Sequence, residues 1–123
     1  LGISQQVLQF NLDDDSLAYF YQNALAFIFP SLYEGFGIPV LESFACGCPL
    51  LCSNVSSLPE VAGNAACYFD PYSEESIRDA VVKLLDDSNF REELIDKGYE
   101  QLKKFSWKQT SEETKKIYES VLI

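Results

Sequence analysis

The chain has 123 residues, 47% of them hydrophobic and 14% aromatic, which is enough for one folded domain with a real core. Its formal net charge is −10, and every Lys and Arg lies at or beyond Arg78, whereas the first 77 residues carry nine carboxylates. Nucleic acid and anionic membrane are therefore excluded as partners, because each needs a basic surface.

No apolar run approaches the roughly 20 residues that a membrane-spanning helix needs, and no basic leader opens the chain. The chain begins at Leu1 and contains no Met, which predicts a piece of a longer protein. There is no His, and the cysteines do not follow a zinc pattern. We expect buried thiols in a reducing compartment, and hence a cytoplasmic protein, with disulfides or a metal as the alternatives. The cysteines are Cys46, Cys48, Cys52 and Cys67.

The N-terminal part of the chain predicts strand, helix and strand in turn. Val7–Phe10 is apolar and short enough for a strand, and the polar turn 11–15 supplies a helix cap. Apolar residues at helical spacing predict a helix over Ser16–Asn23. The wholly apolar run Leu25–Phe29 predicts a strand buried on both faces of a parallel sheet.

Two further βα repeats follow a glycine-containing loop. Pro39 suits the first turn of a helix that runs to about Cys46, and the next strand is predicted at residues 50–53. Ser57–Glu60 has the pattern of a capping box on a short helix. Ala65–Phe69 is then the third strand of this series. Such alternation predicts an α/β fold with a Rossmann-like parallel sheet flanked by helices.

The remainder of the chain predicts helices only. Apolar stripes at helical spacing run through residues 77–85 and 90–102. Ser106–Gln109 resembles a capping box and opens a last helix, in which Ile117, Tyr118 and Val121 are expected to face inward.

The segment from Glu34 to Glu42 lies where a parallel sheet binds ligands, at the carboxyl end of a strand. Gly35 and Gly37 permit positive φ angles and a close approach of the backbone to a ligand. N–H groups near Gly37 and Ile38 would form an anion site at the helix start. The two carboxylates suit hydroxyl pairs of a sugar or ribose. On spacing alone, a solvated loop before a helix start fits equally well.

The sequence around this loop closely resembles the donor-site signature of family 4 glycosyltransferases, with its two glutamates separated by seven residues. The resemblance covers essentially the whole chain. It rests on the segments Pro30–Pro49, Ser53–Asn54, Leu58–Val61, Phe69–Pro71 and Phe105–Trp107.

The resemblance implies a role for each matching residue. Glu34 matches the motif glutamate that contacts hydroxyls of the transferred sugar, and it is the candidate catalytic residue. Glu42 matches the glutamate that holds the ribose diol. The remaining matches are the loop residues whose backbone amides approach the sugar and diphosphate, namely Gly35, Phe36, Gly37 and Ile38. The family transfers sugars with retention of anomeric configuration and needs no metal or other cofactor at this site.

The resemblance also implies which parts of a whole enzyme are outside the chain. Residues 1–123 match part of the C-terminal, nucleotide-sugar-binding half of a GT-B glycosyltransferase, so the acceptor domain and the first βα units are expected to be absent. The family's Arg and Lys on the diphosphate belong to that absent part. The expected partners are a nucleotide-diphosphate sugar and the N-terminal acceptor domain of the same protein. Membrane association is expected only through absent segments. The expected role is polysaccharide or glycolipid assembly, and the isolated chain is expected to be inactive.

Two other functions remain open from the sequence. The first is a non-catalytic nucleotide-binding or protein-interaction module on a degenerate transferase fold. The second is a receiver-like domain that binds magnesium at Asp13–Asp15, although a capped, solvated helix start explains these aspartates more simply. Phe105–Trp107 likewise fits a recognition patch, and better an aromatic anchor that joins two helices.

Overall fold

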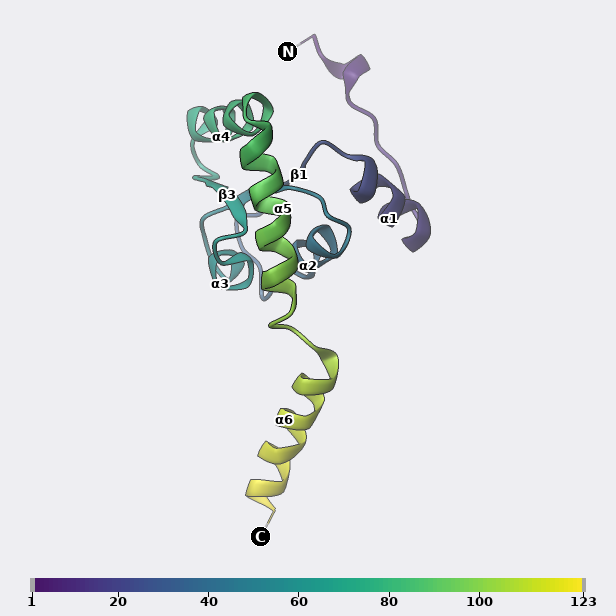
Figure 1. Cartoon of the computed structure of the whole chain (residues 1–123), viewed down its shortest axis with the longest axis vertical. Coiled ribbons are helices and arrows are strands. Elements are labelled where there is room, and N and C mark those ends of the chain that lie inside the picture. Colours follow the sequence, from purple (N-terminus) through teal and green to yellow (C-terminus); the bar gives the residue numbers. More distant parts are fainter. Residues whose placement is uncertain (1, 123) are drawn as a thin grey trace.

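The computed structural model describes residues 2–122 and is centred on a parallel sheet of three strands (Figure 1). The strands β1 (Phe27–Phe29), β2 (Leu50–Ser53) and β3 (Ala66–Phe69) lie side by side in chain order. Phe27 is the register partner of Leu50, which in turn pairs with Ala66. The helices α2 (Ile38–Ala45) and α3 (Leu58–Ala62) connect successive strands. The predicted α/β fold with a flanked parallel sheet is confirmed.

Helices cover both faces of the sheet, but unevenly. One face packs on α2 and α3, and the other packs on α4 (Glu74–Asp86) and α5 (Ser88–Leu102). The central strand β2 is buried along its whole length. Ile28 in β1 is 43% exposed, because α4 and α5 contact β3 and leave that side of β1 open. The prediction that the β1 strand is buried on both faces is therefore wrong.

The N-terminal segment contains no strand within residues 2–13. Val7 and Leu8 are exposed, and the only regular element there is a short 3-10 helix, η1 (Ser4–Gln6). An isolated apolar run of four residues gains β structure only by pairing with a neighbouring strand, and none lies beside it. The predicted helix is confirmed as α1 (Asp14–Asn23), capped by Asp13, whose carboxylate accepts from the Ser16 N–H at 2.9 Å.

The last helix, α6 (Trp107–Val121), projects away from the sheet (Figure 1). Ile117, Tyr118 and Val121 are each about two-thirds exposed, so the expectation that they face inward is wrong. The predicted helix itself is present, but the body of the chain does not reach its apolar face. Ser106 caps α6 by accepting from the Gln109 N–H at 3.4 Å. The reciprocal half of the capping box is absent there, because the Gln109 amide donates to Glu113.

The cysteines are free thiols, and three of the four are buried, as predicted. Burial raises the pKa of the Cys48 thiol to about 11 and that of Cys52 to about 12. These thiols are therefore protonated, unreactive core groups at neutral pH. Within residues 2–122 no helix combines the length and the apolar character that crossing a membrane requires.

Candidate functional site

Glu34 lies in the loop that follows β1, and serines hold both its side chain and its backbone. The Ser31 hydroxyl donates to Glu34 Oε1 at 2.8 Å. The Glu34 N–H donates to Ser56 Oγ at 3.0 Å, and Ser57 Oγ donates to the Glu34 carbonyl at 3.0 Å. Ser31 follows β1, whereas Ser56 and Ser57 follow β2, so the carboxyl ends of neighbouring strands converge on this glutamate. Its position matches where parallel sheets bind ligands.

Only one of the two loop glycines has a positive φ. Gly37 is the N-cap of α2 and has φ 97°, in the left-handed region. A Cβ atom there would lie 2.8 Å from Leu58 Cδ2, so the position also requires the smallest residue. Gly35 does not have a positive φ, and its surroundings leave space for a Cβ. The loop therefore uses the conformational freedom of glycine at Gly37 and not at Gly35, and the close approach of a ligand to either glycine stays a prediction.

The start of α2 is exposed toward the same loop. The helix begins at Ile38 with Pro39 in its first turn, as predicted, and no side chain caps it. Phe36 and Ile38 are partly exposed, at 43% and 47%. An uncapped helix N-terminus favours an anion through its dipole and free N–H groups. That an anion binds at Gly37 and Ile38 stays a prediction.

Glu42 lies one turn into α2 and contacts the neighbouring helix α1. The buried Tyr21 hydroxyl donates to Glu42 Oε2 at 3.3 Å. Burial, together with the Glu42 charge and this hydrogen bond, raises the pKa of Tyr21 above its usual value. Tyr21 is therefore a stable donor at neutral pH. The hydrogen bond from Tyr21 leaves Glu42 exposed and able to accept further hydrogen bonds.

Replacing Tyr21 by phenylalanine should lower the free energy of unfolding by about 0.5–1.5 kcal/mol, the usual net contribution of one hydrogen bond. The ring stays packed edge-on against Phe27, so the core is kept. Urea unfolding measures the change. Tyr19→Phe is the matched control, because Tyr19 lies on the same helix and is 65% exposed. Equal stabilities of the two variants would show that the Tyr21–Glu42 contact contributes nothing.

An apolar groove of about 650 Å³ adjoins the start of α2, and three of the predicted site residues line it, Phe36, Ile38 and Glu42. Its far wall comes from the junction of α5 and α6, where Phe105 packs edge-to-face on Phe36 with ring centroids 5.7 Å apart. The other lining residues are Leu41, Ala45, Leu102, Ser106, Trp107 and Thr110. Glu34, Gly35 and Gly37 do not line this groove, so the predicted site residues share one loop and helix start but not one cavity.

The predicted aromatic anchor at Phe105–Trp107 is half correct. Phe105 packs against the core and reaches the loop through Phe36. Trp107 is 81% exposed and anchors nothing within the described chain.

Sequence reasoning missed four residues that contact the predicted glutamates, Tyr21, Ser31, Ser56 and Ser57. The serines carried a usable signal, since hydroxyls directly after two parallel strands share one edge of the sheet. The sequence instead predicts that Ser57 caps α3. Its side chain makes no cap bond there and instead lies 3.0 Å from both the Glu34 and the Phe36 carbonyl oxygens, to either of which its hydroxyl can donate. For Tyr21 the sequence predicted only an apolar position on a helix, and nothing in it indicated a contact with Glu42.

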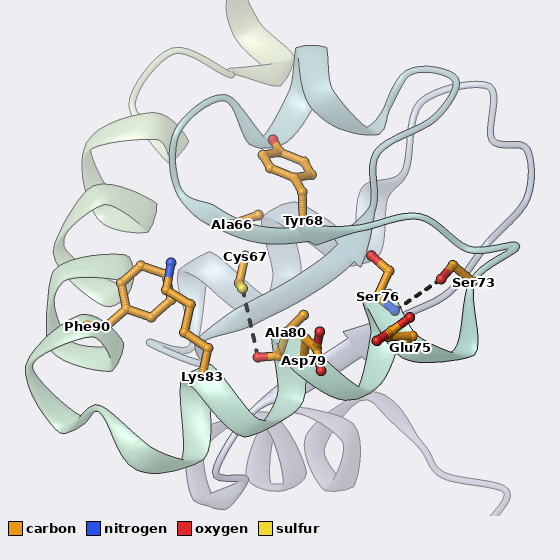
Figure 2. Close-up of a pocket in the computed structure, with 10 residues that line it drawn as sticks. All are labelled: Ala66, Cys67, Tyr68, Ser73, Glu75, Ser76, Asp79, Ala80, Lys83 and Phe90. Carbon is orange, nitrogen blue, oxygen red and sulfur yellow. Dashed lines mark hydrogen bonds between the residues drawn. The ribbon is translucent and has the colours of Figure 1, made fainter.

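A second cavity, of about 680 Å³, lies along β3 and α4, away from this loop (Figure 2). Its polar side chains already serve local structure. Ser73 caps α4 through the Ser76 N–H, and Asp79 pairs with Arg78 at 2.8 Å. Lys83 lies over the Phe90 ring at 4.2 Å from its centroid. These groups do not converge on one point, and we assign this cavity no function.

The aspartates at the start of α1 act as helix-terminal residues. Asp13 caps the helix, and its hydrogen bonds with Ser16 lower its pKa. Among residues 2–122 no group of three or more His, Cys, Asp or Glu side chains is placed to hold a metal ion. The capped helix start predicted for Asp13–Asp15 is confirmed.

Comparison with known families identifies the chain. The family of glycosyl transferases group 1 matches residues 1–101, which is most of the sequence and includes the whole loop from Glu34 to Glu42. The chain belongs to this family. The sequence-based resemblance to glycosyltransferases is confirmed at this level.

Several curated relatives carry mannosyltransferase names. O-antigen chain mannosyltransferase B of Escherichia coli is 43% identical over 105 residues, which are 85% of this chain and 28% of that protein. MMP alpha-(1->4)-mannosyltransferase of Mycolicibacterium hassiacum is 33% identical over 127 aligned positions, covering 99% of this chain and 31% of that protein. The chain thus spans less than a third of the length of these relatives.

Solved structures agree with the fold. A sucrose-phosphate synthase from Thermosynechococcus elongatus superposes with a TM-score of 0.83 at 24% identity, covering 94% of this chain and 30% of the other. The C-terminal domain of a group 1 glycosyl transferase from Francisella tularensis gives 0.71 at 25% identity, over 84% of this chain and 55% of the other. The chain has the fold of GT-B glycosyltransferases, with a helix at its C-terminal end.

Proposed function

We propose that this chain forms part of the sugar-nucleotide site of a retaining GT-B hexosyltransferase, which moves a sugar from a nucleotide diphosphate to a saccharide or lipid-linked acceptor. The observation that carries the proposal is the convergence of Ser31, Ser56 and Ser57 on Glu34, beside the uncapped start of α2. A carboxylate fixed at a strand end can accept hydrogen bonds from sugar hydroxyls. A helix N-terminus can stabilise the departing diphosphate.

Within this proposal each predicted residue keeps a distinct role. Glu34 contacts the sugar as the catalytic candidate, and Glu42 accepts from the ribose diol with its orientation aided by Tyr21. The backbone of residues 35–38 faces the sugar and diphosphate, and Gly37 gives the loop its left-handed turn. The transition state would have oxocarbenium character, so stabilising the leaving diphosphate is the main task of the site. Neither glutamate is proposed as a nucleophile.

The sugar we propose is mannose, on the support of the mannosyltransferase names among the relatives. A donor screen with the full polypeptide tests this directly. Product should form from a mannosyl nucleotide at a kcat/KM at least tenfold above that for the glucosyl and galactosyl nucleotides. Transfer from a different hexose donor would correct the sugar and keep the reaction class. Absence of transfer from every nucleotide sugar would contradict the reaction class.

The isolated chain should bind a nucleotide sugar weakly, with a dissociation constant of about 1 mM or more. It has no cation before Arg78, and Arg78 itself pairs with Glu75 and Asp79. A helix N-terminus contributes only about 0.3–2 kcal/mol to anion binding, whereas a dissociation constant of 1 mM already corresponds to about 4 kcal/mol. Isothermal titration calorimetry at low salt measures the affinity. Micromolar binding would show that the missing cations are not needed.

The acceptor-binding part is proposed to lie outside residues 1–123. The chain spans less than a third of the length of these relatives, and the site proposed above has groups for the donor alone. We propose that the same polypeptide supplies the acceptor surface and the cations for the diphosphate, and that the enzyme acts in the cytoplasm in polysaccharide assembly.

A further inference from the structure

Ser56 and Ser57 form a hydroxyl clamp on the backbone of the Glu34 loop. Ser56 Oγ accepts from the Glu34 N–H at 3.0 Å and lies 3.3 Å from the Glu34 carbonyl, to which it can donate. Ser57 Oγ lies 3.0 Å from both the Glu34 and the Phe36 carbonyl oxygens. Glu34 and these serines are more than 20 residues apart in the chain, so the clamp joins the loop after β1 to the loop after β2.

The clamp is built on a strained backbone. Ser56 has φ 53° and is the only residue other than glycine with positive φ among residues 2–122. Such a conformation is unfavourable for a residue with a side chain and persists only where the surroundings hold it in place. Here the left-handed turn is accompanied by two successive hydroxyls that both reach the backbone of Glu34. The strain therefore coincides with the contact to a predicted site residue.

We infer that Ser56 and Ser57 are positioning residues for Glu34, and this inference rests on the proposed transferase function. They fix the backbone of the glutamate, and Ser31 fixes its carboxylate through a separate hydrogen bond at 2.8 Å. Ser57 also holds the carbonyl of Phe36, directly before Gly37, so the clamp sets the path of the loop into α2. We assign both serines to the loop backbone and neither to the substrate.

Loss of a positioning residue mainly lowers kcat, whereas loss of a purely structural residue mainly lowers stability. The clamp hydrogen bonds lie at the surface or half-buried, so the loss of one should leave the chain folded and shift its thermal stability only slightly. Misplacing a catalytic group by about 1 Å can lower turnover about 100-fold. Loss of a clamp hydroxyl should thus affect kcat far more than stability, and kcat more than the KM for the donor.

The test compares variants of the full polypeptide. Ser57→Ala removes one hydroxyl, and Ser57→Thr keeps an Oγ at the same place. Ser56→Gly removes the other hydroxyl while still permitting positive φ. We expect Ser57→Ala and Ser56→Gly to lower kcat 10- to 100-fold with less than a threefold change in KM for the nucleotide sugar. Ser57→Thr should recover kcat to within threefold of the wild type.

Ser111→Ala is the matched control, because the Ser111 hydroxyl also donates to a backbone carbonyl, at 2.8 Å, but on α6. It should leave kcat unchanged. A kcat of Ser57→Ala within twofold of the wild type, alongside a large loss in Glu34→Ala, would overturn the clamp and keep the proposed function. A similar loss in Ser57→Ala and Ser57→Thr, with matching losses of thermal stability, would also overturn it, because it would indicate a structural role.

Amide hydrogen exchange on residues 1–123 tests the clamp without any activity. The Glu34 amide should exchange at least tenfold faster in Ser56→Gly, while amides of the central strand β2 keep their protection. Unchanged exchange at Glu34 would overturn the clamp. If Glu34→Ala left transfer intact, the proposed function would fail, and this exchange measurement would still decide whether the serines hold the loop.

Discussion

Glu34→Ala is expected to lower sugar transfer by the full polypeptide by about 100- to 1,000-fold, the size of effect seen when one preorganised group of a catalytic site is removed. The structure gives a reason to expect so large a loss. Hydrogen bonds with Ser31, Ser56 and Ser57 hold the Glu34 backbone and carboxylate, so the group is fixed before a substrate arrives. A group held this way contributes without reorganising during the reaction.

The loss should appear in kcat without loss of the fold. Glu34 is half-buried, and its carboxylate accepts only the Ser31 hydroxyl among the hydrogen bonds of residues 2–122, so the core does not depend on it. Steady-state kinetics and thermal unfolding together measure this. Glu60→Ala is a matched control, since Glu60 is an exposed glutamate in α3. Turnover of Glu34→Ala within threefold of the Glu60→Ala value would contradict the assignment of Glu34.

Glu42→Ala should have a smaller effect on kcat and a larger one on the KM for the donor. In the proposal Glu42 holds the ribose, which does not react, and binding lost equally from ground and transition states raises KM. Its loss also leaves the buried Tyr21 hydroxyl without its acceptor. We therefore expect some loss of stability with Glu42→Ala and none with Glu34→Ala.

The sequence predicted the elements that carry their own periodicity and turn chemistry. The strand 50–53, the helix after Pro39 and the cap at Ser106 were all correct, because each depends on a few adjacent residues. The errors at Val7–Phe10, Ile28 and α6 have one common cause. An apolar pattern says that a face can be buried, but only the three-dimensional neighbourhood decides whether anything covers it.

For the candidate site, too, the sequence predicted the local position of residues but not their contacts with distant parts of the chain. The sequence placed Glu34 and Glu42 at the end of a strand and the start of a helix, and the structure has them there. It did not reveal the clamp, because Ser56 and Ser57 lie in a different loop and Ser57 has the sequence pattern of a helix cap. The sequence also did not predict that Glu42 lines a groove while Glu34 contacts serines outside that groove. This difference depends on where the side chains point, which the sequence pattern does not determine.

The charge distribution explains why the proposal places the sugar and ribose contacts in this chain and the cations for the diphosphate outside it. The loop offers carboxylates, hydroxyls and a helix N-terminus, which suit a sugar and a ribose, and the first 77 residues hold no cation. The cations of the described chain lie on α4, α5 and the segment through α6, where several pair with neighbouring carboxylates. In the proposal this chain would therefore bind the sugar and the ribose of the donor, and cations outside it would balance the charge of the diphosphate that the start of α2 leaves uncompensated.

Gly37→Ala is expected to destabilise the chain by several kcal/mol, whereas Gly35→Ala, two residues away, should change stability by less than about 0.5 kcal/mol. An alanine at position 37 would have to adopt φ 97°, which costs about 1–2 kcal/mol, and its Cβ would lie 2.8 Å from Leu58 Cδ2. Leu58 is fully buried, so this overlap adds about 1–3 kcal/mol.

At position 35 φ is not positive, and a Cβ added there would have no atom within 4 Å. Urea unfolding of both variants measures the difference, and equal stabilities would show that the loop relaxes without strain.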